Sequence, residues 1–316
     1  MKKIMMTMPF IAITAFVICI TACSGGKNES KDISNADSLK AYLDKQPLNN
    51  PDKPLKIAMK ADEMTIRTIS EVIYNAKKYV SLNLSESSLT AIPDSTFSGN
   101  EWLASIVIGA GITGIGNSAF SDCTSLMSIT IPESIISIGE RAFQGCLSLK
   151  SVTIPSGVTI IGNGTFSQCT GLESIIIPAS VTFIDFAAFM NCQSLKSVTI
   201  PENVISIEGY SFERCSSLTN IILPASVNSV GKYAFYGCNR LNSVTFQGGI
   251  PANQFSLHCG FQGDLHVKYF DKNPAKGTPG TYITHNPGDN AVWTLLKGDS
   301  DELKSIKSLP GLFSGN

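Results

Sequence analysis

The chain has 316 residues, of which 43% are hydrophobic and 16% charged, and its formal net charge is −1. This apolar content is sufficient for the core of one or two domains. The near-neutral charge argues against a nucleic-acid partner, because such proteins usually carry a basic stripe. With so few charged residues, we expect a surface covered largely by Ser, Thr, Asn and Gly.

The N-terminal segment predicts export. Lys2 and Lys3 precede an uncharged, mostly apolar run over residues 4–22. A basic start, an apolar stretch and a small residue at the cleavage point are typical of a secretory signal, which we assign to residues 1–22. An uncleaved membrane helix is the alternative, since the apolar run is just long enough to span a bilayer.

The end of this segment also predicts a lipid anchor. Its last residues, Ile20-Thr21-Ala22-Cys23, resemble the acylation box of bacterial lipoproteins. We therefore expect acylation of Cys23, which would attach the protein to a membrane. Cys19 fits worse, because the bulky Ile18 stands at its cleavage position.

Residues 23–36 are small and polar, and they predict a flexible tether. Residues 37–96 form the expected N-terminal cap region, in which helices and first strands precede the repeats. We predict helices at residues 37–43 and 62–77 and strands at residues 55–59 and 79–84.

A strict internal period follows over residues 97–262. Phe, Cys, Pro and Leu each recur every 23 residues and stay in phase with one another, and Asn100 fills the first Cys position. The Phe positions are 97, 120, 143, 166, 189, 212 and 235, and the Cys positions are 123, 146, 169, 192, 215 and 238. Four residue types in one register predict about seven structural repeats.

One repeat shows how a turn should be built. Residues 126–131 alternate like a strand, and Pro132 ends it because proline has no N–H to donate. Ile135 and Ile138 offer a second apolar edge, and a short helical turn should follow Gly139 and end at Phe143. One such turn cannot offset its own conformational entropy, so the turns must stack.

The unit FxxCxxLxxIxIPxxVxxIG resembles the BspA-type bacterial leucine-rich repeat over about residues 80–262. This resemblance implies a leucine-rich-repeat solenoid, a β-dominated α/β fold wound as a right-handed superhelix with atypical caps at both ends. It also implies adhesion to host matrix proteins or to other cells.

Residues 263–316 form the expected C-terminal cap and tail, because the register fails after Phe246. We predict a closing strand at residues 265–270 and a last strand at residues 291–296. Residues 271–290 are rich in Gly, Pro, Asn and Thr, and the tail 297–316 gives no pattern that would specify structure.

The repeat register also accounts for several patterns that suggest chemistry. Residues 109–114 match GxGxxG, but Gly109 occupies the Pro position of the repeat, and a dinucleotide fingerprint needs a helix after it. The cysteines are expected to be reduced core residues, with disulfides and metal binding as weaker alternatives. No metal-ligand or nucleophile motif occurs, so we predict no cofactor, no metal and no enzyme activity. An enzyme that uses His258, His266 and His285 is the remaining alternative.

The outward positions of the strands are the candidate binding face, because extended solenoid faces are where such proteins usually bind. Small hydroxyl side chains predominate there, with apolar exceptions: Ser128, Thr130, Ser151, Thr153, Ser174, Ile176, Ser197, Thr199, Asn220, Ile222, Ser243 and Thr245. Small residues also keep a sheet soluble and closely stacked, so a purely structural role is the alternative. Tyr210, Tyr233 and Tyr236 are a second candidate contact patch.

Together these features predict an exported, lipid-anchored surface protein that binds protein or glycan ligands on host or bacterial surfaces. The alternative is a structural or periplasm-facing envelope protein without a host ligand.

Overall fold

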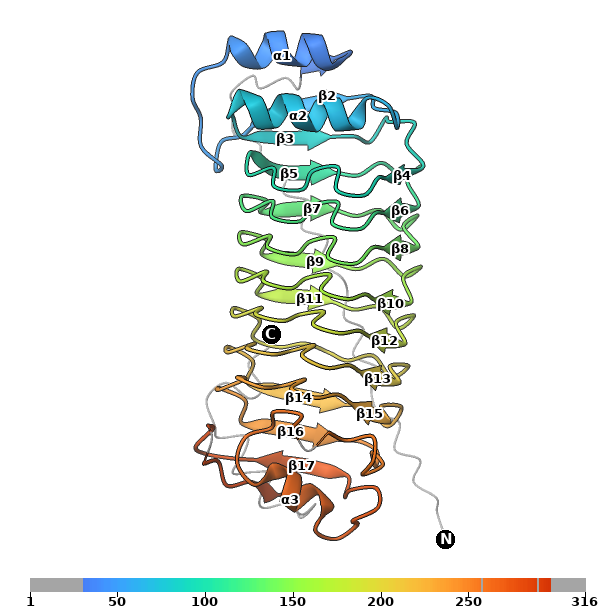
Figure 1. The fold of residues 1–316 in the computed structure, drawn as a ribbon, viewed down its shortest axis with the longest axis vertical. Helices are drawn as coiled ribbons and strands as arrows, with labels where there is room; N and C mark the ends of the chain where they lie inside the picture. Colours follow the sequence, from blue (N-terminus) through green and yellow to red (C-terminus); the bar gives the residue numbers. More distant parts are fainter. Residues whose placement is uncertain (1–30, 257, 289, 297–316) are drawn as a thin grey trace, which may run out of the picture.

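The 23-residue repeats stack as successive turns of an elongated solenoid of about eight turns, which confirms the predicted architecture (Figure 1). The computed structural model describes residues 31–256, 258–288 and 290–296. Each turn passes through a longer strand, a short strand and a segment of tight turns before it reaches the next repeat. The predicted signal peptide, Cys23 and the tail 297–316 lie outside the described residues.

The longer strands lie side by side along one side of the solenoid (Figure 1). Where these strands pair they are parallel, and within the repeats the partners are one repeat apart, as in the pairs Ser105–Ser128, Ser151–Ser174 and Asn220–Ser243. Residues 197–199 occupy the corresponding position without being assigned as a strand. These strands are β1 (Lys31–Ile33), β2 (Leu55–Met59), β3 (Val80–Asn83), β5 (Leu103–Val107), β7 (Ser128–Thr130), β9 (Ser151–Thr153), β11 (Ser174–Ile176), β14 (Asn220–Leu223) and β16 (Ser243–Phe246).

The short strands form a second column, visible on the right of Figure 1. They pair in parallel with a step of one repeat, as Ile161 does with Ile184. They are β4 (Ala91–Ile92), β6 (Gly114–Ile115), β8 (Ser137–Ile138), β10 (Ile160–Ile161), β12 (Phe183–Ile184), β13 (Ser206–Ile207) and β15 (Ser229–Val230).

The third segment of each turn differs from the expectation, because tight turns replace the predicted short helical turn. Two positions in each repeat adopt left-handed backbone angles, for example Arg141 and Gly145. A left-handed residue cannot continue an α-helix. Their N–H groups instead donate to carbonyls of the next repeat, Arg141 N to Asn163 O at 2.9 Å and Gly145 N to Ser167 O at 2.8 Å. The turns therefore link neighbouring repeats rather than closing on themselves.

The core is a column of phenylalanine rings bordered by a column of thiols. The seven Phe side chains of the register stack with centroid separations between 5.1 and 5.6 Å. Each register Cys is buried, and its Sγ donates a hydrogen bond to a Phe carbonyl of the preceding repeat, as Cys169 does to Phe143 O at 3.1 Å. The predicted core-packing role of the cysteines is confirmed.

The N-terminal cap closes the first turn with helices α1 (Ala36–Asp44) and α2 (Ile66–Ala76), close to the predicted ranges. Ile66, Ile69 and Ile73 of α2 are buried. The predicted tether 23–36 is wrong at its end, because β1 pairs with β2 and extends the sheet by one strand.

The C-terminal cap contains the largest departures. Helix α3 (Leu265–Phe270) replaces the predicted closing strand, because Leu265 and Tyr269 are buried one helical turn apart. Strand β17 (Gly280–Ile283), which the sequence did not indicate, pairs antiparallel with β16. Strand β18 (Thr294–Leu295) follows within the predicted range 291–296. In the described part of the chain, no helix is both long and apolar enough to cross a membrane.

Candidate functional site

The predicted binding face exists as a surface over most of its length. Its exposed members follow one another up the stacked strands: Ser128, Thr130, Ser151, Thr153, Ser174, Ile176, Ser197, Thr199 and Ile222. Ile176 is 63% exposed and Ile222 is 51% exposed, so two apolar side chains stand among small hydroxyl groups. We call this surface the strand face.

The strand face ends earlier than predicted at its C-terminal end. Ser243 is buried, and Asn220 and Thr245 are half-buried. The reason is the antiparallel strand β17, which pairs with the edge of β16. Thr245 Oγ1 lies 2.9 Å from Thr281 Oγ1, so this hydroxyl is already hydrogen-bonded within the cap.

The same column of hydroxyl side chains continues toward the N-terminus, but its members there are half-buried. Ser105 is paired with Ser128 and lies in the same register. Ser81 of β3 follows it after a register shift, and the two hydroxyl oxygens of Ser81 and Ser105 are 2.6 Å apart. The 23-residue period could have predicted Ser105, which lies 23 residues before Ser128. It could not have predicted Ser81, because the register shifts between β3 and β5.

A small charged cluster borders the strand face. Lys196 Nζ lies 3.0 Å and Lys150 Nζ 3.8 Å from the Glu173 carboxylate. The hydrogen bond and charge of Lys196, followed by the charge of Lys150, lower the pKa of Glu173 below its usual value. These groups directly precede Ser151, Ser174 and Ser197 in the chain.

A second candidate surface lies on the tight-turn segments, where aromatic rings run from one repeat to the next. The ring centroids of Phe186 and Tyr210 are 5.2 Å apart, those of Tyr210 and Tyr233 5.2 Å, and those of Tyr233 and Tyr236 5.6 Å. We call these four residues the aromatic ladder. The structure thus brings together the three tyrosines singled out in the sequence. Phe186 was missed because it lies one position off the register of Tyr210 and Tyr233.

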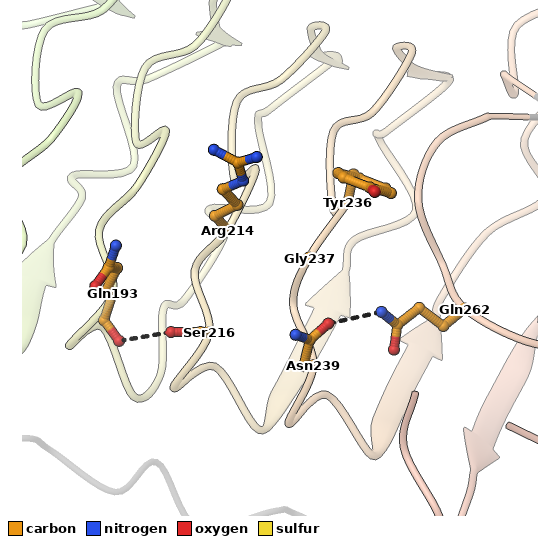
Figure 2. A pocket seen from close by; sticks show the side chains of 7 residues that line it. All are labelled: Gln193, Arg214, Ser216, Tyr236, Gly237, Asn239 and Gln262. Carbon is orange, nitrogen blue, oxygen red and sulfur yellow. Dashed lines mark hydrogen bonds between the residues drawn. The ribbon is translucent and has the colours of Figure 1, made fainter. Parts of the chain in front are cut away.

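An open pocket of about 440 Å³ adjoins the end of the aromatic ladder. Figure 2 shows Gln193, Ser216, Asn239 and Gln262 on successive turns, with Arg214 and Tyr236 above them. The first four residues are 23 residues apart, so they form one polar column. We call this hollow the turn-side pocket.

Gly237 lines the turn-side pocket and lets the Arg214 side chain lie close to its backbone. Its φ is +76°, and a Cβ atom there would lie 2.9 Å from Arg214 Cγ. Within the polar column, Gln262 Nε2 donates to Asn239 Oδ1 at 2.7 Å, which fixes the two amides against each other. The column also includes Ser216, whose hydroxyl lies 3.5 Å from Gln193 O.

The short-strand side carries exposed apolar residues that the sequence had not indicated. Ile136, Ile160, Phe183 and Ile205 lie on consecutive repeats. They were missed because the register predicts an apolar edge there without showing which of its side chains face outward.

The glycine pattern and the histidines that suggested nucleotide binding or catalysis lie at ordinary positions of the fold. A Cβ on Gly109 would lie 2.8 Å from Leu84 O, so this glycine allows close packing of two turns, and strand β6 follows instead of a helix. His266 packs against Phe255 and Phe270 in the C-terminal cap, and burial lowers its pKa. His258 stacks on Tyr233, and His285 is exposed after β17. Among the residues that the structure describes, no group of three or more His, Cys, Asp and Glu side chains is arranged to hold a metal ion.

Comparison with known families gives one clear match. Residues 62–173 and 159–258 match the family described as BspA type leucine rich repeat region, in six copies. The comparison with curated proteins gives no match.

Solved structures of bacterial repeat proteins are also similar. The leucine-rich repeat protein of T. pallidum is 32% identical with a TM-score of 0.50, over 52% of this chain and 78% of that one. A leucine-rich repeat protein from Bacteroides ovatus is 32% identical with a TM-score of 0.49, over 58% of this chain and 53% of that one. A leucine-rich cell surface protein from Faecalibacterium prausnitzii is 19% identical with a TM-score of 0.30, over 69% of this chain and 83% of that one.

Proposed function

The chain belongs to the BspA-type leucine-rich repeat family, and from this premise we propose that it is an exported, lipid-anchored adhesion protein. In this proposal the strand face binds protein partners, such as matrix proteins of a host or proteins on other cells. The observation that carries it is the run of exposed Ser, Thr and Ile side chains over neighbouring repeats.

The composition of the strand face suits association with another protein. Small hydroxyl side chains lose little rotamer entropy when a partner covers them, and their oxygens can both donate and accept hydrogen bonds. Ile176 and Ile222 add exposed apolar area at two points, which are two repeats apart. At protein interfaces, a few buried side chains surrounded by polar residues often provide most of the binding energy.

The proposed anchor rests on the sequence of the N-terminal segment. The basic start, the apolar run and Cys23 support acylation, and a lipid of more than one chain holds a protein firmly on a membrane. β1 begins at Lys31, only a few residues after Cys23. The cap would then sit near the membrane, and the repeats would extend away from it.

A binding experiment with matched variants tests the strand face. Cells that produce the full chain, and the full chain purified in detergent, are tested against a panel of extracellular matrix proteins. The double variant Ile176→Lys/Ile222→Lys should weaken binding at least tenfold. The control Ile136→Lys/Ile160→Lys changes residues of nearly equal exposure, 63% and 50%, on the short-strand side, and it should bind normally. Equal loss in both variants, or no binding to any panel member, would contradict the proposal.

Two measurements on intact cells test the anchor and the location. Metabolic labelling with a fatty-acid analogue should mark the wild-type chain and Cys19→Ala, and it should fail for Cys23→Ala. External protease should release fragments of the repeat region from intact cells. Labelling that persists in Cys23→Ala would contradict acylation at this residue. Complete protection from protease would support the envelope alternative.

A further inference from the structure

The turn-side pocket combines an exposed aromatic ring with a column of polar side chains, a combination that suits a sugar. Tyr236 is 48% exposed at one side of the pocket. Asn239, Gln262 and Arg214 lie around it (Figure 2). We propose that this pocket binds a neutral oligosaccharide, with a pyranose ring stacked on Tyr236 and its hydroxyl groups bonded to the polar column.

The polar column can satisfy neighbouring sugar hydroxyls, each of which donates and accepts. The 2.7 Å bond from Gln262 Nε2 to Asn239 Oδ1 uses one donor and one acceptor of this amide pair. Within the described part of the chain, Asn239 Nδ2 and Gln262 Oε1 have no other partner. The hydrogen-bonded pair therefore presents a donor and an acceptor from adjacent turns.

The aromatic side of the pocket provides the stacking surface. The apolar face of a pyranose ring, formed by C–H groups, packs against the face of an aromatic ring. The ring of Tyr233 packs edge-on to Tyr236, with an interplanar angle of 64° and a centroid separation of 5.6 Å, so the Tyr236 ring is held in place. The aromatic ladder continues from this point toward Phe186, which would allow a chain of several sugars to extend past the pocket.

The charge of the pocket favours a neutral sugar over an acidic one. Arg214 is its one charged lining residue in the described structure, and its Nε lies 3.7 Å from Glu213 Oε1. The guanidinium charge is therefore balanced within its own turn, while its terminal nitrogens remain able to donate. The volume of about 440 Å³ lies within the range of small-ligand sites, roughly 300–1,000 Å³.

The concave shape of the turn-side pocket favours a small ligand over a flat protein surface. Protein–protein interfaces are mostly broad and closely packed, whereas a small ligand is held in a concave site with a few polar groups. Because Gly237 has no Cβ atom, the Arg214 side chain can lie against it, and a methyl group there would displace this lining residue of the pocket. This inference concerns a different segment of the turn from the strand face, and it does not depend on the adhesion proposal.

A panel of immobilised oligosaccharides tests the inference on the full chain in detergent. The panel contains neutral gluco-, manno-, galacto- and N-acetylglucosamine oligomers, together with sialylated and uronate-containing ones. We expect at least one neutral oligosaccharide to bind, and calorimetry then measures its Kd. Tyr236→Ala should weaken this binding at least tenfold, whereas Tyr74→Ala, an exposed tyrosine of α2, should leave it unchanged.

A glycine pair provides a control for backbone strain. Gly237→Ala and Gly145→Ala place a methyl group at the same register position, where φ is +76° and +71°. The methyl group of Gly145→Ala would also clash with the Asp122 carboxylate, so this variant should lose at least as much stability, measured by circular dichroism, but only Gly237→Ala should weaken sugar binding. Equal weakening by the two would show an effect of strain alone and would overturn the proposed contact at Gly237.

Other outcomes are also decisive. Binding that survives both Tyr236→Ala and Gly237→Ala, or no binding of any neutral oligosaccharide, would overturn the inference. So would binding restricted to acidic sugars and abolished by salt. The variant Ile176→Lys/Ile222→Lys should keep full sugar binding, so failure of the adhesion proposal and failure of this one give different results.

Discussion

Alkaline pH should destabilise this solenoid steeply, because the described part of the chain buries seven thiols in the core. Burial raises the pKa of Cys169, Cys238 and Cys259 to about 12. The same desolvation raises the pKa of the other four buried thiols, Cys123, Cys146, Cys192 and Cys215. In the unfolded chain each thiol has a pKa of about 8.5.

The direction of the effect follows from which state releases protons. Below pH 8.5 the thiols are neutral in both states, so the stability that they provide is fully present. Between pH 8.5 and 12 the unfolded chain ionises and the folded protein does not, so the free energy of unfolding falls as pH rises. Each thiol contributes a loss of about 0.8 kcal/mol at pH 9 and about 1.4 kcal/mol at pH 9.5.

Seven thiols together make this loss comparable with the stability of a whole domain. Their sum is about 6 kcal/mol at pH 9 and about 10 kcal/mol at pH 9.5, against a typical total of about 5–15 kcal/mol. The repeat produces this sensitivity, because one slightly acidic core residue recurs in almost every turn.

Urea unfolding followed by circular dichroism, from pH 7 to 9.5 with a reductant present, measures the effect. The triple variant Cys146→Ala/Cys169→Ala/Cys192→Ala starts less stable at pH 7, because it lacks three thiol hydrogen bonds. Its loss of stability with pH should nevertheless be smaller by about three sevenths, since the remaining four thiols still ionise on unfolding. This change in slope separates the thiols from Lys and Tyr residues, which titrate equally in both proteins.

Stability that stays constant from pH 7 to 9.5 would refute the assignment of these residues as buried, neutral thiols. An equal pH dependence in the wild type and the triple variant would refute it as well. Alkylation provides an independent check, since only the thiolate reacts. At pH 8 the native core thiols should react with iodoacetamide only as fast as the protein unfolds.

Asn100→Ala should lower the free energy of unfolding by about 1–3 kcal/mol. The buried Asn100 amide donates to Ser70 O at 3.0 Å and so connects the first repeat to α2. An unchanged urea midpoint would contradict this. Replacing Phe143 and Phe166 by Leu, singly and together, should reveal a coupling energy of about 0.5–1.5 kcal/mol for rings stacked at 5.4 Å. A pair of Phe residues three turns apart should show no coupling, and equal values for the two pairs would exclude a contribution from stacking. Trp293→Leu should lower the free energy of unfolding by about 2–4 kcal/mol. Trp293 is buried in the C-terminal cap, and its Nε1 donates to Gln262 O at 2.8 Å. Hydrogen exchange should then accelerate in residues 243–295, and uniform exchange along the chain would argue against a local role.

The repeat register predicted the parts of the structure that depend on many identical contacts. The Phe and Cys columns lie in the core at every repeat, because a stacked turn must place the same position at the same depth. The capping helices were predictable for a different reason, since their apolar spacing and polar boundaries are local signals. The register shows that Asn100 replaces a Cys. It could not predict that Asn100 bonds to Ser70, because Ser70 lies in α2, outside the repeats.

The caps and turns were less predictable because they depend on contacts outside the register. The segment Leu265–Phe270 is short enough for its apolar residues to fit a strand or a helix, and packing of Tyr269 on Phe246 at 4.0 Å is compatible with the helix. Strand β17 lies in a stretch rich in Gly and Pro, yet pairing with β16 orders it. The left-handed residues were hidden because Ser, Asp, Arg and Gln occupy positions where glycine would have signalled the conformation.

The candidate sites are formed by outward-facing residues. The amino acid at these positions can differ from one repeat to the next, whereas the inward-facing positions keep the same residue. At the left-handed position of successive turns the chain places Arg214, Gly237 and Gly260, and Tyr236 lies beside the central glycine. An outward substitution usually changes stability by less than about 0.5 kcal/mol, because each turn is held by its core and by backbone bonds to its neighbours. The repeat therefore constrains the inward columns strongly and the outward columns weakly. A pocket such as the one at Gly237 can form in this way without any change in the fold that supports it.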